Sequence, residues 1–102
     1  MIKVNIRKKD NKVYEIVIKG HANYDDYGKD IVCSAVSTMA ITTVNNIICL
    51  EDSISYEEDS GLLVIRVLED TDINQKILNN FIRMINELKM QYPKNIEIRN
   101  EV

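Results

Sequence analysis

Residues 31–50 read IVCSAVSTMAITTVNNIICL, and this stretch decides the fold that the rest of the sequence must fit. Its apolar side chains recur three and four residues apart, which makes a double stripe along one side of a helix. The stripe contains Ile31, Val32, Ala35, Val36, Met39, Ala40, Val44, Ile47 and Ile48. Such a stripe is typical of a helix that packs on a sheet, so we expect a helix over residues 31–50.

The residues before this helix predict a β-hairpin and then a loop. Residues 2–8 alternate apolar and polar side chains, the segment KKDNK (8–12) supplies a turn, and residues 13–18 are again rich in β-formers. The hairpin should end at Gly20. Residues 21–30 show no period and contain Asn, Gly and three Asp, which predicts a loop that is long for a chain of this size.

The residues after the helix predict a second hairpin, a second helix and a last strand. The strands should cover about 53–58 and 61–68, with a turn at 59–61. The apolar stripe of residues 71–91 is typical of an amphipathic helix, and residues 96–99 alternate like a strand. The order is therefore ββαββαβ.

This order predicts a two-layer α+β fold in which two helices pack on one face of a mostly antiparallel sheet. At 102 residues, the chain is expected to form a single domain, residues 1–102. Thirteen Lys and Arg against sixteen Asp and Glu give a net charge of −3, so we do not expect nucleic acid as a direct partner. The apolar runs are too short to cross a membrane, and residues 1–10 lack a signal-peptide pattern. We therefore expect a cytoplasmic protein without membrane association.

The two cysteines are expected to remain reduced. Cys33 and Cys49 are sixteen residues apart on one predicted helix. That separation corresponds to a rise of about 24 Å, which is far beyond the reach of a disulfide. Reduced thiols also suit the cytoplasm.

The only histidine, His21, lies one loop before Cys33, and this spacing has a chemical interpretation. The thiolate is the reactive form of cysteine, and free cysteine has a pKa of about 8.5. Cys33 is in the first turn of the predicted helix, where backbone N–H groups and the helix dipole favour an anion. An imidazolium nearby would favour it further. The amide of Cys33 and its neighbours could also stabilise an oxyanion.

Two neighbours of this pair have more than one interpretation. The Asp30 carboxylate could cap the helix by reaching the amides of Val32 or Cys33, or it could orient His21 as the third member of a triad does. Ser37 is one turn after Cys33 on the same side of the helix and could hydrogen-bond a substrate or the sulfur.

Simpler interpretations apply to each residue taken alone. A single histidine in a loop is usually a solvated surface residue, and a single cysteine is usually a small core residue. One His, one Cys and scattered aspartates do not form a recognisable metal site, so we expect neither a metal nor another cofactor.

The segment as a whole resembles the ribosomal-processing cysteine protease family (Prp) of bacteria. The resemblance rests on GHA at 20–22, a Tyr-containing polar loop, and GKDIVCSAVS at 28–37. Its matching residues are Gly20, His21, Ala22, Tyr27, Gly28, Asp30, Ile31, Val32, Cys33, Ala35, Val36 and Ser37. Ser34 departs from the alanine expected after the nucleophile. The ββαββαβ order agrees with the family over the full length.

The resemblance implies a homodimeric cysteine endopeptidase that removes the N-terminal extension of large-subunit ribosomal protein twenty-seven. Cys33 would be the nucleophile and His21 its base, with Asp30 orienting the base or only capping the helix. Candidate substrate-binding residues are Gly20, Tyr24, Tyr27, Gly28 and Ser37. The peptide substrate would be a ribosomal protein precursor. The alternatives are a non-catalytic ribosome-assembly interaction module and, less favoured, a thiol hydrolase for another acyl substrate.

Overall fold

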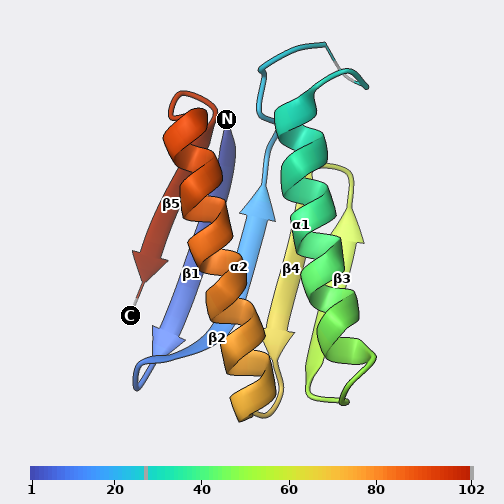
Figure 1. Ribbon diagram of the computed structural model, residues 1–102, viewed down its shortest axis with the longest axis vertical. Helices are drawn as coiled ribbons and strands as arrows, with labels where there is room; N and C mark the ends of the chain where they lie inside the picture. Colours follow the sequence, from blue (N-terminus) through green and yellow to red (C-terminus); the bar gives the residue numbers. More distant parts are fainter. Residues whose placement is uncertain (27, 102) are drawn as a thin grey trace.

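The computed structural model describes residues 1–26 and 28–101, and over these the elements follow the predicted order (Figure 1). They are β1 (Ile2–Lys9), β2 (Lys12–Lys19), α1 (Ile31–Ile48), β3 (Ile54–Asp59), β4 (Leu62–Val67), α2 (Asp72–Gln91) and β5 (Ile96–Glu101). Both helices lie over the same face of the sheet (Figure 1). The predicted α+β fold with two helices on one face is therefore confirmed.

The five strands form one sheet in the order β3-β4-β2-β1-β5. The pairs β1–β2, β2–β4 and β3–β4 are antiparallel, whereas β5 runs parallel to β1. The sheet is mostly antiparallel, as predicted, and its only described parallel pair joins the first and last strands. A β-strand can return parallel to β1 here because α2 supplies the long crossover that such a connection needs.

The core lies between the helices and the sheet. It is built from one face of each element: Val32, Val36, Ala40, Val44 and Ile47 of α1, Leu78, Phe81 and Ile85 of α2, and Ile6, Ile16 and Ile65 of the strands. The predicted stripe of α1 is wider than its buried face. Ile31 and Ile48 are 56% and 46% exposed because they lie on the flank that the sheet does not cover.

Most boundaries differ from the predicted ones by one or two residues, and two of these differences have a local reason. The first turn is only Asp10–Asn11, whose φ angles of 50° and 63° suit the tight turns that match strand twist, so the strands extend into KKDNK. Helix α1 ends at Ile48, with Cys49 as its C-cap, two residues before the predicted end.

Helix α1 is long and apolar enough to cross a membrane by length and composition alone, with a mean hydropathy of 1.6. The core helix of a globular domain meets the same criteria. In this fold α1 packs its inward face on the sheet, with residues such as Val32, Val44 and Ile47 buried in the core.

One end of the sheet gathers the segments that matter for function. The loop after β2, the start of α1, the β3–β4 turn and the connection from α2 to β5 all lie at this end, together with the N-terminus (Figure 1). Gly20 lets the chain leave β2 tightly. Its φ is +92°, and a Cβ there would lie 2.5 Å from the carbonyl oxygen of Met1, so a larger residue does not fit.

Candidate active site

Asp30 joins the start of α1 to the preceding loop. Its Oδ1 accepts hydrogen bonds from the N–H groups of Val32 (2.9 Å) and Cys33 (3.0 Å), which is the geometry of an N-cap. Its Oδ2 accepts from the N–H groups of Tyr24 (2.9 Å) and Asp25 (3.2 Å). The predicted cap is therefore present, and the same carboxylate also tethers the loop.

The environment of Asp30 favours its ionised form. Burial raises the pKa of this carboxyl, since the residue is only 6% exposed. Hydrogen bonds from the N–H groups of Cys33, Tyr24, Asp25 and Val32 outweigh that effect, so the pKa of Asp30 lies below its usual value. Asp30 acts as a fixed negative acceptor around which the loop folds.

The sulfur of Cys33 is held by a backbone group of the loop. The N–H of Ala22 donates to Cys33 Sγ at an N···S distance of 3.1 Å. Cys33 is half-buried, in the first turn of α1 as its position in the sequence predicted. Because Ala22 directly follows His21, this bond also holds the backbone of His21 close to the thiol.

A residue far along the chain fixes the other side of Ala22. The side-chain amide of Asn95 donates to the carbonyl oxygen of Ala22 at 3.0 Å, while the carbonyl oxygen of Asn95 accepts from the N–H of Ile2 at 2.9 Å. Next to this contact, the rings of Tyr24 and Tyr92 pack edge to face, with centroids 5.2 Å apart. The connection between α2 and β5 thus supports the loop that carries His21.

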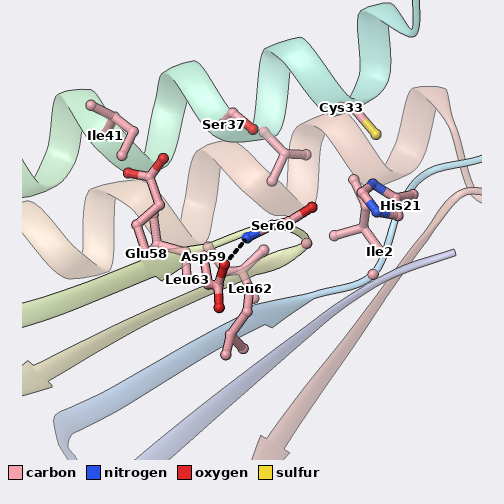
Figure 2. Close-up of a pocket in the computed structure, with 14 residues that line it drawn as sticks. Ile2, His21, Cys33, Ser37, Ile41, Glu58, Asp59, Ser60, Leu62 and Leu63 are labelled. Carbon is pink, nitrogen blue, oxygen red and sulfur yellow. Dashed lines mark hydrogen bonds between the residues drawn. The ribbon is translucent and has the colours of Figure 1, made fainter. Parts of the chain in front are cut away.

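His21 and Cys33 face a shared space between α1 and the β3–β4 turn (Figure 2). A first cavity of about 260 Å³ is lined by His21, Cys33, Ser37 and the turn. A second, of about 560 Å³, lies on the loop side and is lined by the same three residues together with Asn23, Asp25, Gly28, Asp30, Ser34 and Thr38. The thiol and the imidazole therefore lie where the two cavities meet, as a pair acting in the middle of an extended chain would.

The first cavity combines an apolar floor with an acidic edge. Its floor is formed by Ile2, Ile18, Val36, Ile41 and Leu63. Glu58 and Asp59 come from the end of β3, and the Glu58 side chain extends toward α1 near Ile41 (Figure 2). Such a surface can accept an apolar side chain and attract a cation beside it.

The Cys33 amide, expected as a possible oxyanion donor, already has a partner in this structure. That N–H donates to Asp30 Oδ1, and the next amide, of Ser34, donates to the Asp30 carbonyl oxygen at 3.1 Å. The Asp30 cap and the first helical bond therefore occupy the amides of Val32, Cys33 and Ser34. The donor that points at the sulfur is the N–H of Ala22.

The remaining candidate residues fall into three groups. Gly20 lines the first cavity, Gly28 the second, and Ser37 both. Tyr24 packs on Tyr92 and is tethered to Asp30, which gives it a role in holding the loop. Tyr27 lies outside the described residues.

Both cysteines are free, as expected, with Cys49 exposed near the other end of α1. Within residues 1–26 and 28–101, no three His, Cys, Asp or Glu side chains gather closely enough to hold a metal ion.

The chain is similar to known proteins over nearly its whole length. A family model described as cysteine protease Prp matches residues 1–97. The ribosomal processing cysteine protease Prp of Staphylococcus aureus (strain NCTC 8325) is 33% identical over 96% of this chain and 97% of its own length. The protein of the same name from Bacillus subtilis (strain 168) is 26% identical, and the match covers 100% of this chain and 99% of that protein.

Solved structures of the same family also match this chain. The crystal structure of the S. aureus Prp with a covalently linked product peptide matches with a TM-score of 0.92 at 32% identity, covering 99% of this chain and all of that one. The complex with a substrate peptide matches with a TM-score of 0.88 at 30% identity and the same coverage. The fold and the comparisons define a cysteine protease. The chain belongs to the Prp family.

Proposed function

We propose that this chain is an endopeptidase that removes the N-terminal extension of large-subunit ribosomal protein twenty-seven, with Cys33 as nucleophile and His21 as base. The observation that carries the proposal is the placement of these two side chains at the junction of two cavities that together resemble a groove for an extended peptide. The S. aureus relative, which binds substrate and product peptides, supports a peptide substrate.

The reaction is an acyl transfer in two stages. The Cys33 thiolate attacks the scissile carbonyl carbon, and the C–N bond then breaks as His21 protonates the leaving amine. A water molecule next attacks the thioester while His21 accepts its proton. The C–S bond breaks, which releases the new carboxylic acid and restores the thiolate and the imidazolium, and the acid then loses its proton to the solvent.

In this mechanism we assign the N–H of Ala22 a part in stabilising the oxyanion. It lies 3.1 Å from the sulfur that becomes bonded to the carbonyl carbon. The oxyanion forms one bond beyond that carbon, so it develops within reach of the same donor. A fixed backbone donor of this kind stabilises an oxyanion without rearrangement during the reaction.

The charges around the cavities suit a basic substrate. Glu58 and Asp59 line the first cavity and Asp25 the second, and the chain carries a net charge of −3. Ribosomal proteins are strongly basic, so the acidic edges would steer the precursor toward the thiol, and cleavage should slow as salt screens the attraction.

The experiment is incubation with an extended ribosomal protein precursor followed by mass measurement of the products. Wild-type protein should release one N-terminal peptide, and Cys33→Ala and His21→Ala should abolish cleavage without unfolding the chain. Cys49→Ala is the matched control because it removes the other thiol of the same helix. If Cys33→Ala still cleaves, the protease mechanism is wrong. If wild-type protein binds the precursor without cleaving it, the interaction-module alternative gains support.

We also propose that the chain acts in the cytoplasm as a homodimer. The two reduced cysteines suit that compartment. The sheet ends in strands β3 and β5, whose outer edges are available for pairing with another chain, and a second copy is an economical way to cover such edges.

A further inference from the structure

The imidazole of His21 rests on the turn between β3 and β4. A Cβ placed on Gly61 would lie 3.1 Å from His21 Nε2, 3.4 Å from Cε1 and 3.8 Å from Cδ2. The ring therefore occupies the space that a side chain at position 61 would need. Ser60 and His21 face the same part of the cavity (Figure 2).

The same glycine also holds the backbone just before the histidine. The N–H of Gly20 donates to the carbonyl oxygen of Gly61 at 2.9 Å. Gly61 thus touches the segment twice, once through its carbonyl and once through the open side of its α-carbon. These two contacts set both the start of the loop and the position of the ring.

Backbone conformation alone does not explain a glycine here. Gly61 has φ +67° and directly precedes β4, whereas Asn11 has φ +63° and directly precedes β2 in the first hairpin. The first turn thus has a side chain at a nearly identical backbone angle, because asparagine tolerates this region. What distinguishes position 61 is the imidazole above it.

We propose that Gly61 is a positioning residue for His21, and that the β3–β4 turn is the platform on which the proposed base is seated against Cys33. This inference rests on the proposed function. A Cβ at 3.1 Å would force the ring to move by a few tenths of an ångström. Because proton transfer depends steeply on the placement of the reacting groups, we expect kcat to fall by roughly threefold to tenfold, with KM little changed.

The test uses three variants. Gly61→Ala adds both a Cβ and backbone strain. Gly61→Asn also adds a Cβ, but asparagine tolerates the positive φ at this position, so it adds little strain. Asn11→Ala is the matched control because it places alanine at nearly the same φ in the distant turn. Since His21 is the only histidine, its ring resonances in the NMR spectrum report its position directly and without substrate.

Both Gly61 variants should shift the His21 ring resonances, lower kcat and alter the pH profile of Cys33 alkylation by iodoacetamide in the same direction as His21→Ala. Asn11→Ala should change none of these, although it lowers stability. The inference is overturned if Gly61→Asn behaves like wild type, since strain alone then explains the glycine, or if neither variant moves the resonances. The NMR and alkylation measurements need no cleavage, so they remain decisive even if the proposed substrate fails.

Discussion

Replacing Asp30 should separate the stability of helix α1 from the order of the loop. Asp30→Ala removes four hydrogen bonds, two at the start of the helix and two in the loop. Loss of an N-cap costs about 1 kcal/mol. The amides of Tyr24 and Asp25 belong to exposed residues and can turn to water, so each of their bonds is worth about 0.5 kcal/mol. We expect the free energy of unfolding to fall by about 2 kcal/mol.

Asp30→Ser distinguishes the two contributions. The single hydroxyl oxygen of serine can cap the helix, but this shorter side chain cannot also reach the loop amides. The free energy of unfolding should therefore fall by only about 1 kcal/mol. Both variants should nevertheless cleave the precursor at least about tenfold more slowly, because Ala22 and His21 depend on the tethered loop for their placement. Asp26→Ser, which removes the same charge from the same loop, is the control.

The assays are urea unfolding at neutral pH, precursor cleavage followed by mass, and hydrogen exchange across residues 21–30. The loop should exchange faster in both Asp30 variants than in the wild type or in Asp26→Ser. The reasoning is refuted if Asp30→Ala unfolds within about 0.5 kcal/mol of wild type, or if Asp30→Ser cleaves at the wild-type rate while its loop amides exchange faster.

Three further outcomes follow from the structure. Because the pKa of Asp30 is lowered on folding, its stabilisation is fully present above the unfolded value near 3.9 and is lost as pH falls through the folded value. The difference in free energy of unfolding between wild type and Asp30→Ala, measured by urea titration, should thus shrink below about pH 4. If this difference at pH 2 equals that at neutral pH, the prediction is wrong. Limiting iodoacetamide at neutral pH should label Cys33 before Cys49, and His21→Ala should shift the Cys33 profile toward higher pH; an unchanged profile would mean that the two do not form a pair in the free protein. Sedimentation should show a dimer at micromolar concentration, whereas a monomer insensitive to concentration would count against it.

Most of the fold could be predicted from local patterns in the sequence. The stripes of α1 and α2 and the alternation of the strands are set by short-range spacing, which sequence displays directly. The N-cap at Asp30 is also local, because its partners Val32 and Cys33 are two and three residues away. The boundaries that moved depend on the backbone conformation of a few terminal residues, as at the end of α1 and at the Asp10–Asn11 turn.

The site was only partly visible in the sequence, because its supports are contacts between distant segments. Asn95 reaches Ala22 from the far end of the chain, and Gly61 meets His21 only after β4 pairs with β2. Neither residue stands out locally, since an Asn after a helix and a Gly in a turn are ordinary. The oxyanion donor shows a different limit: the cap and the oxyanion would need the same Cys33 amide, and in this structure that amide donates to Asp30.

The parallel pairing of β5 with β1 has a consequence for biosynthesis. Strand β5 leaves the ribosome well after β1 and pairs with it, and Asn95, just before β5, donates a hydrogen bond to Ala22, which holds Ala22 beside the thiol. Closing so long a chain is the slow part of folding for a topology of this kind. A nascent chain from which β5 has not yet emerged lacks both this strand and the Asn95 bond, so the loop that carries His21 is not yet supported.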